Sequence, residues 1–216
     1  MLELGSKVLL SFLLGSLNGS LLIGRFYGVD IRTEGSGNAG GTNALRTQGK
    51  LFAFLVMSID ISKGWLPAQY LPVLALPGIP LDPDVSRTWL MVACAGAAIV
   101  GHCYPVWFQF RGGKGAATAI GALIAIAPEL LLPGAGAFIA VLVLSGYVSV
   151  ATMTAFVFLP VYFGAMGYGQ GQIIGQPIWL FLILLAAFIV FTHRENIWRL
   201  REGREHRFER VMLFRR

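Results

Sequence analysis

Long apolar runs alternate along the chain with short segments rich in glycine, proline or arginine. A membrane-spanning helix needs about 20 mostly apolar residues, and several of the runs approach or exceed that length. The pattern predicts seven spans, which lie at about 8–27, 51–76, 88–104, 116–132, 135–148, 150–166 and 178–192. Because the fourth and fifth runs adjoin around residues 128–136, a count of six is the alternative.

The composition agrees with a helical bundle in lipid. The 216 residues are 56% hydrophobic and 13% charged, whereas a soluble domain contains roughly a quarter charged residues. Glycine occurs 27 times, and small residues let membrane helices approach closely. The length, together with the lack of a fixed-period repeat, predicts one all-α, polytopic integral membrane domain over residues 1–216.

The orientation follows from basic residues, because short loops rich in Lys and Arg favour the cytoplasm. Positive charge gathers in residues 27–50, at Arg111 and Lys114, and in the eight Arg of residues 194–216. The other connecting segments, 77–87 and 167–177, hold one Arg between them. Seven spans place all three basic segments on the cytoplasmic face, with the N-terminus outside and the C-terminus inside. Six spans would place the tail opposite the first basic loop.

The two ends of the chain each allow two interpretations. Glu3 and Lys7 precede the first apolar run without a basic n-region or a clear small-residue cleavage site. The first run is therefore expected to be a retained span and not a signal peptide. A basic tail is often a nucleic-acid-binding segment, but after a hydrophobic span a juxtamembrane anchor on anionic lipid is favoured.

Several kinds of chemistry are excluded by motifs that the sequence lacks. Cys94 and Cys103 form no CxxC pair, and no His, Cys and Asp residues have metal-ligand spacing. No disulfide framework, metal or cofactor is therefore expected. The chain has no GxSxG nucleophile elbow, and no histidine is followed by Asp in an HxxxxD signature.

The first motif with candidate chemistry is the segment 35–46. Four glycines in residues 35–41 let the backbone turn tightly and direct N–H groups inward, and such concave backbone binds anions. The polar side chains of this segment are those of Ser36, Asn38, Thr42, Asn43 and Arg46. One of the glycines, Gly37, lies between Ser36 and Asn38. A planar guanidinium suits phosphate. A flexible linker is the alternative, although linkers rarely interleave Asn, Thr and Arg so densely.

The second motif lies between the third and fourth apolar runs and comprises His102, Gly112, Gly113, Lys114, Gly115 and Thr118. A helix N-terminus presents unpaired N–H groups and partial positive charge, so an anion can bind there beside the lysine. Phe108 and Gly115 stand where a Walker A loop needs Gly and Ser or Thr, so nucleotide hydrolysis is excluded. A basic cytoplasmic loop with a glycine turn is the alternative.

The third motif stands where the last apolar run meets the tail. His193 and Asn196 are three residues apart and share one helix face. A histidine there can act as a general base or as a cationic phosphate ligand, and a solvated helix cap is the alternative. The role of His102 is open between the site and a structural hydrogen bond, and His206 is assigned none.

Three polar residues near or inside apolar runs complete the candidates. Asp60 and Lys63 lie one helical turn apart in the second run, and charges inside a membrane indicate a functional site or a buried pair. A structural pair is favoured, with a substrate role as the alternative. The predicted topology places Ser149 on the same face as the three motifs.

Together these motifs resemble the bacterial acyl-phosphate:glycerol-3-phosphate acyltransferase family of integral membrane enzymes. The family pattern contains Gly-Ser-Gly-Asn-x-Gly-x-Thr-Asn-x-x-Arg, Phe-x-Gly-Gly-Lys-Gly-x-Ala-Thr, Tyr-Val-Ser and His-Arg-Glu-Asn-Ile-x-Arg. The matching segments here are 35–46, 60–64, 102–118, 147–149 and 193–199. Gly41 replaces a usual Ala, Gly146 stands where many members have a basic residue, and residues 209–216 extend beyond the pattern.

The resemblance implies transfer of an acyl group from acyl phosphate to the 1-hydroxyl of sn-glycerol 3-phosphate. The products are lysophosphatidate and inorganic phosphate, made at the cytoplasmic face of a bacterial inner membrane. The implied partners are the two substrates and membrane lipid, without nucleic acid, cofactor or metal, and a monomer is compatible with the pattern. Since phosphate is already a good leaving group, no covalent acyl-enzyme is expected.

The resemblance also implies roles for single residues. Those expected to be catalytic are Ser36, Arg46, Lys114, His193 and Asn196. Those expected to bind substrate are Gly37, Asn38, Thr42, Asn43, Gly112, Gly113, Gly115, Thr118 and Ser149. The acceptor of the hydroxyl proton is open between His193 and a phosphate oxygen of the substrate.

A transporter of phosphate or of a phosphorylated metabolite is the alternative from another class. It would also need anion-binding loops and basic residues. Transporters tend to place their site at the bilayer midplane between related repeats. Here the motifs are predicted at one interface and the sequence has no visible repeat, which favours the enzyme.

Overall fold

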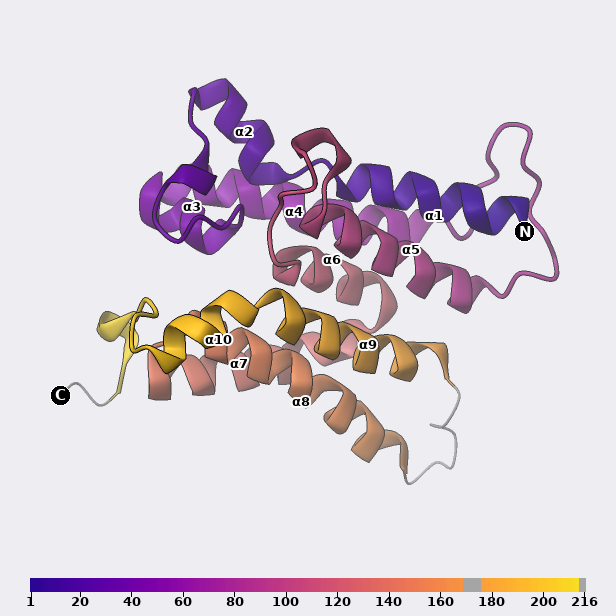
Figure 1. Ribbon diagram of the computed structural model, residues 1–216. Coiled ribbons are helices and arrows are strands. Elements are labelled where there is room, and N and C mark those ends of the chain that lie inside the picture. The colour runs from indigo at the N-terminus through magenta and orange to yellow at the C-terminus, as the bar shows by residue number, and fades with distance from the viewer. Residues whose placement is uncertain (169–175, 214–216) are drawn as a thin grey trace. The chain divides into compact units, whose positions relative to one another are not determined.

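The computed structural model describes residues 1–168 and 176–213. The described residues form helices and, apart from one isolated bridge, no strand, which confirms the all-α prediction. The chain divides into two compact units, Met1–Ile126 and Ala127–Arg216 (Figure 1). Each unit is a helical bundle with its own packing.

The helices of the first unit are α1 (Leu2–Gly15), α2 (Gly19–Tyr27), α3 (Gly41–Thr47), α4 (Lys50–Tyr70), α5 (Arg87–Cys103) and α6 (Ala116–Ile126), with 3-10 turns η1 (Ile31–Thr33) and η2 (Val106–Phe108). α1 packs along α5, and α4 lies against both α5 and α6. α2 and α3 pack on α4, where Ile31, Ala44, Phe52 and Val56 belong to one buried cluster.

Small residues allow the closest helix crossings in this unit. A Cβ atom at Gly64 would lie 2.0 Å from Thr118 O, and one at Gly121 would lie 1.9 Å from Ile61 O. The backbones of α4 and α6 therefore almost touch. Gly101 of α5 approaches the backbone of α1 in the same way, so larger side chains at these positions would force the helices apart.

The first predicted span is not one continuous helix. α1 and α2 are separated by residues 16–18 and meet at a bend of 40°. Asn18 caps α2, because its side-chain oxygen accepts a hydrogen bond from Leu21 N at 3.2 Å. The helix also starts earlier than predicted. Glu3 and Lys7, expected before the span, are buried residues of α1, where they pair with each other.

The second unit contains α7 (Leu131–Ser145), α8 (Val148–Tyr168), α9 (Pro177–Thr192) and α10 (Arg194–Arg201), with 3-10 turns η3 (Pro128–Leu130) and η4 (Glu209–Val211). α8 packs against both α7 and α9. α10 follows α9 directly, with a bend of 52° between them. The third motif thus lies at a sharp turn between an apolar helix and a polar one.

Four helical segments of the described chain are long and apolar enough to cross a membrane: Lys50–Tyr70, Arg87–Phe108, Pro128–Ser145 and Val148–Gly167. The number rises to six if the bent pairs α1–α2 and α9–α10 each form one span. The predicted span 116–132 was too long, since α6 ends at Ile126. Pro128 explains this end, because proline disfavours helical conformation in the residue before it.

Candidate functional site

The first glycine loop, residues 35–41, is shaped by the side chain of Asn43. The Asn43 amide donates to Ile31 O at 2.9 Å and to Glu34 O at 3.0 Å, and its oxygen accepts from Ser36 N at 3.0 Å. Gly35 has φ +56°, and a Cβ atom there would lie 2.4 Å from Asn43 Oδ1. Asn43, predicted to bind substrate, is therefore buried and fully used in folding the loop.

The other polar side chains of this motif are more accessible. Thr42 and Arg46 are exposed on α3, while Ser36 and Asn38 are half-buried in the loop before it. Gly37 has φ +72° and is exposed at the tip of the turn. Hydroxyl, amide and guanidinium donors thus lie within a few residues of one another, as an anion-binding loop requires.

The second glycine loop, residues 109–115, uses its glycines differently from the prediction. The N–H groups of Gly112 and Gly113 donate to Cys103 O at 3.1 Å and His102 O at 3.2 Å. A Cβ atom at Gly113 would lie 2.1 Å from His102 Nε2. Glycine is therefore needed here for close packing on the end of α5, and these two N–H groups bind carbonyls of the protein.

The end of this loop leads into α6. Gly115 has φ +90°, and α6 begins at the next residue. Lys114 is half-buried two residues before that helix start, where a cation and the helix N-terminus can act on an anion together. Thr118 lies one turn further along, fully buried, and its Oγ1 has no hydrogen-bond partner in the described part of the chain.

The two glycine loops are joined by a residue that sequence reasoning did not assign to the site. The guanidinium of Arg32 donates to Phe108 O at 3.4 Å and to Arg111 O at 3.2 Å. It also pairs with Asp30 at 2.6 Å. The hydrogen bonds from Arg32 hold the pKa of the Asp30 carboxyl below its usual range, although burial opposes this. These contacts bring the segment just before the first motif beside the second motif, while the shared membrane face of the motifs stays a prediction.

Asp60 and Lys63 form the buried pair that was favoured from the sequence. Lys63 Nζ lies 2.8 Å from Asp60 Oδ1, and both side chains are almost fully buried. His102 Nδ1 lies 3.4 Å from the same carboxylate oxygen. These three residues, called the central ion cluster below, connect α4 with the end of α5.

In the second unit, the Tyr-Val-Ser segment and the third motif converge on Glu205. Ser149 Oγ and Asn196 Nδ2 donate to Glu205 Oε1 at 2.9 and 2.7 Å, and Arg199 Nε donates to Oε2 at 2.8 Å. Burial raises the pKa of Glu205, but the hydrogen bonds from Asn196, Arg199 and Ser149 outweigh it and leave the pKa below its usual range. Glu205 was missed because it stands among arginines in the tail.

His193 stands at the junction of α9 and α10 with a defined ring orientation. Its Nδ1 lies 2.7 Å from Ile189 O. A carbonyl oxygen can only accept, so Nδ1 bears the hydrogen in this contact. In the neutral ring, Nε2 is then the nitrogen with the lone pair, which suits a base that accepts a proton.

Gly146 replaces a basic residue of the pattern, and the structure brings an arginine of the tail to it. Gly146 has φ +76°, and a Cβ atom there would lie 2.9 Å from Arg207 Cγ. Arg207 Nε donates to Ser145 O at 3.0 Å, and its guanidinium lies over the Tyr147 ring. A positive charge is therefore present at this turn, contributed by a distant part of the chain.

No group of three or more His, Cys, Asp or Glu side chains that could hold a metal ion occurs among residues 1–168 and 176–213. Cys94 and Cys103 are buried free thiols. The motifs contain hydroxyls, amides and cations, which suit binding of an anion by hydrogen bonds and charge, while the nearby carboxylates Asp30, Asp60 and Glu205 are paired with protein donors.

Comparison with known proteins gives a consistent result. The family model described as Glycerol-3-phosphate acyltransferase matches residues 6–203. A protein of that name from Geotalea daltonii is 40% identical over 201 residues, covering 93% of this chain and 95% of the relative. One from Aquifex aeolicus is 36% identical, covering 93% and 97%. The matches therefore extend over almost the whole of each protein.

Solved structures agree with the sequence relatives. The crystal structure of PlsY (YgiH), an integral membrane glycerol 3-phosphate acyltransferase, in its glycerol 3-phosphate form, is similar to this chain with a TM-score of 0.78 and 35% identity. The match covers 95% of both chains. The lysophosphatidic acid form matches with a TM-score of 0.77. These similarities and the apolar helices establish an integral membrane protein.

Proposed function

This chain belongs to the glycerol-3-phosphate acyltransferase family, and we propose that it transfers an acyl group from acyl phosphate to the 1-hydroxyl of glycerol 3-phosphate. The products are lysophosphatidate and inorganic phosphate. The observation that supports the proposal best is the contact of Arg32, just before the first glycine loop, with Phe108 O and Arg111 O at the second. The transporter alternative has no such family support.

The charges of the substrates explain why this site needs cations. Acyl phosphate and glycerol 3-phosphate are both anions, so their approach is opposed by repulsion. Arg46 and Lys114 supply two positive charges, and the start of α6 adds partial positive charge. Charge-assisted hydrogen bonds from such groups to phosphate are roughly twice as strong as neutral ones.

We propose direct substrate contact for polar side chains of each unit. In the first unit, Ser36 and Thr42 are proposed to contact the acyl phosphate and Asn38, Arg46 and Lys114 the glycerol phosphate, and all five are half-buried or exposed. In the second unit, Ser149 and Asn196 keep the proposed role toward the acyl phosphate and His193 the role toward the glycerol phosphate. These three side chains are buried, and the donors of Ser149 and Asn196 would exchange the Glu205 carboxylate for phosphate. Gly37 and Gly115 are retained as parts of the binding loops, and Thr118 as a proposed substrate contact in the first turn of α6. Asn43, Gly112 and Gly113 are now proposed to shape the loops, because their donors already bind the protein.

The proposed reaction is a direct acyl transfer. The 1-hydroxyl oxygen attacks the carbonyl carbon of the acyl phosphate and forms the ester bond. The bond between that carbon and the phosphate oxygen breaks, and phosphate departs with the bonding electrons. The hydroxyl proton goes to His193 Nε2 or to a phosphate oxygen. Catalysis then comes mainly from positioning and from electrostatic stabilisation of developing charge.

We further propose that the whole chain acts as one domain in a bacterial inner membrane, with its reaction at the cytoplasmic face. One family model covers residues of both units. Seven spans, with α6 as the short one, place the basic segments on the cytoplasmic side, where short basic loops are favoured. The N-terminus is then outside and the C-terminus inside.

The test is an assay of the purified protein in detergent or lipidic phase with palmitoyl phosphate and glycerol 3-phosphate. Phosphate release and lysophosphatidate, identified by mass, are the expected readouts. Palmitoyl-CoA serves as a parallel donor. If product forms only with palmitoyl-CoA, the protein is still an acyltransferase, but the proposal that acyl phosphate is the donor is wrong. If a folded sample makes product from neither donor, the proposed reaction is wrong.

Lys114→Ala tests the proposed cation at the start of α6. Because a positioned donor to developing charge is lost, we expect kcat/KM to fall about 100- to 1,000-fold. Lys50→Ala is the matched control, since Lys50 is an exposed lysine at the start of α4, outside the motifs. A Lys114→Ala enzyme with near-normal turnover at saturating substrate would contradict the charge-based account.

A further inference from the structure

We propose that Asp60, Lys63 and His102, the central ion cluster, are positioning residues. They hold the break between α1 and α2, and through that break they set the positions of the two glycine loops. The inference rests on the proposed acyltransferase function of these loops. It assigns a role to three buried polar side chains that the reaction itself does not use.

The helix break creates backbone groups that have no helical partner. In hydrocarbon such groups are costly unless other parts of the protein satisfy them. Lys63 Nζ donates to Leu17 O at 3.1 Å, and Asp60 Oδ1 accepts from Gly19 N at 3.0 Å. The ion pair thus satisfies a carbonyl just before α2 and an amide at its start, and so stabilises the backbone at the break.

The residues at the break in turn hold both loops. Asn18 Nδ2 donates to Ala39 O at 3.4 Å, which attaches the first glycine loop. Ser16 Oγ accepts from Val106 N at 3.4 Å, which attaches the segment that leads into the second. A change in the angle or the offset of the break would therefore move both loops.

His102 is the direct link between the central ion cluster and the second loop. Its Nδ1 faces Asp60, and its Nε2 lies 2.1 Å from the position that a Cβ atom of Gly113 would take. The same Cβ position is 2.8 Å from Ala39 O of the first loop. The imidazole thus occupies the space beneath the point where the loops meet. It is 2% exposed, which favours positioning over contact with substrate.

The hold of the cluster on His102 is electrostatic. Among the residues that the structure describes, neither Asp60 Oδ2 nor His102 Nδ1 makes a hydrogen bond. The ring is therefore held by the nearby Asp60 carboxylate on one side and by its packing against Gly113 on the other. A change that keeps the shape of Asp60 but removes its charge should release the ring without opening a cavity.

The experiment uses the full-length protein with Asp60→Asn, His102→Phe and His102→Gln. Glu3→Gln is the matched control, because it neutralises a buried carboxylate at the opposite end of the same unit. For each variant, kcat and KM are measured with palmitoyl phosphate and glycerol 3-phosphate. Hydrogen exchange is followed in residues 35–41 and 109–115 as a readout that needs no activity.

We expect Asp60→Asn and His102→Phe to lower kcat about ten- to hundredfold, since small misplacement of reacting groups is enough for that loss. The KM of either substrate should change by less than about threefold, because the binding groups remain. Exchange in both loops should become faster. His102→Gln should retain more activity than His102→Phe, because its amide can still face Asp60. Glu3→Gln should lower thermal stability and leave kcat and loop exchange unchanged.

Parental kcat and parental loop exchange in both Asp60→Asn and His102→Phe would overturn the proposal. An equal loss of kcat in Glu3→Gln would also overturn it, because the effect would then be general destabilisation. If Asp60→Asn fails to fold, His102→Phe decides the question, since it leaves the Asp60–Lys63 pair intact. A folded parent without product would refute the proposed function, and the exchange data would still test the positioning.

Discussion

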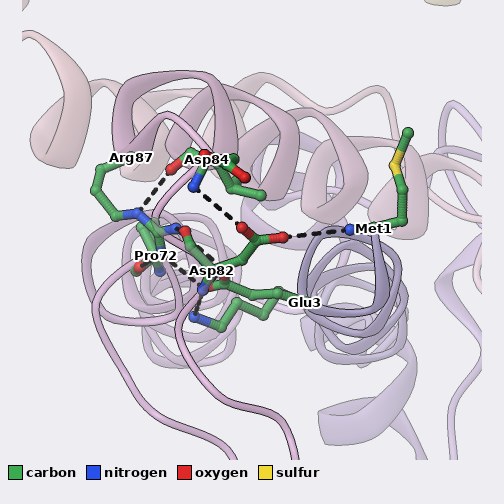
Figure 2. A network of polar contacts seen from close by, with 8 residues as sticks. Met1, Glu3, Pro72, Asp82, Asp84 and Arg87 are labelled. Carbon is green, nitrogen blue, oxygen red and sulfur yellow. Dashed lines mark hydrogen bonds and ion pairs between the residues drawn. The ribbon is translucent and has the colours of Figure 1, made fainter.

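The first unit contains two buried ion clusters that use similar residues in different ways. The terminal ion cluster consists of Glu3, Lys7 and Arg87 and lies where α1 begins (Figure 2). Both oxygens of Glu3 are satisfied: Lys7 donates to Oε1 at 2.7 Å, Asp82 N to Oε2 at 2.8 Å, and Arg87 to both. Asp60 of the central cluster has every partner on one oxygen.

The partners of the arginine show what the terminal cluster does. Arg87 also donates to the carbonyl oxygens of Pro72, Asp82 and Val85 (Figure 2). It therefore ties the connection between α4 and α5 to the first turn of α1. Glu3 and Arg87 each have several partners, so the loss of one contact leaves others in place. The central cluster, by contrast, is built around a helix break.

The comparison teaches that burial of a charge does not by itself indicate function. A cluster whose polar atoms are all hydrogen-bonded holds elements together, while an incompletely satisfied cluster beside the glycine loops can transmit small displacements to them. The two clusters should therefore respond differently to equivalent substitutions. The following predictions test that difference.

Lys63→Met should have the largest effect on stability. It leaves the Asp60 carboxylate buried with only His102 and Gly19 N near it, and removal of one partner of a buried ion pair costs about 3–5 kcal/mol. The free energy of unfolding, measured by denaturant titration in detergent micelles, should fall by that amount. If Lys63→Met lowers the free energy of unfolding by less than Lys7→Met does, the proposed difference between the two clusters is wrong.

Arg87→Ala should have an intermediate effect on stability. Glu3 keeps Lys7 and Asp82 N as partners, but the carbonyls of Pro72 and Val85 lose their donor. The thermal midpoint should lie between those of Lys63→Met and Lys7→Met. The kcat of the folded fraction should equal that of the parent, because the glycine loops lie at the other end of α1. A lowered kcat would show that the clusters do not differ in function.

Lys7→Met should have a small effect, although Lys7 is the most deeply buried cation of the chain that the structure describes. Arg87 still neutralises Glu3, and methionine removes the cost of keeping an ammonium out of water. Replacing an ion by an apolar group of similar size is often nearly neutral, so we expect a change below about 1 kcal/mol. Denaturant titration of both Met variants under the same conditions gives the comparison.

The smallest effect on stability is expected for the partly exposed Asp30–Arg32 pair beside the glycine loops. The pKa of Asp30 is lowered in the folded protein, so its contribution to stability is present above the ordinary value of 3.8 and is lost as pH falls through the folded pKa. The difference in unfolding free energy between parent and Asp30→Asn should be constant from pH 8 to about 5 and shrink only in stronger acid. A difference that changes near neutral pH would contradict this assignment.

The motif residues illustrate what could be predicted for the site. Ser36, Arg46 and Lys114 were predicted from residue types and spacing, because anion binding needs donors and cations in short, turn-forming segments, and their roles stay predictions. The contacts of Asn43 and Gly113 could not be predicted in that way. Asn43 has the donors of a ligand-binding residue, and only the fold shows that those donors bind the loop itself.

Residues that join distant segments were the ones missed. Arg32 and Glu205 are charged residues in polar segments, where most charges are solvated. Their importance comes from partners far along the chain: Phe108 O for Arg32, and Ser149 for Glu205. No local pattern contains that information.

The sequence by itself determined that the protein is a helical membrane protein of this family, and it predicted which segments bind anions, because hydrophobic run length and motif spacing are local properties of the chain. The tertiary structure decided the rest. It broke the first apolar run at residues 16–18, ended α6 before Pro128, and selected which charges pair. Those outcomes depend on whether another helix supplies a partner for a backbone group or an ion. Only the packing of the helices determines which groups meet.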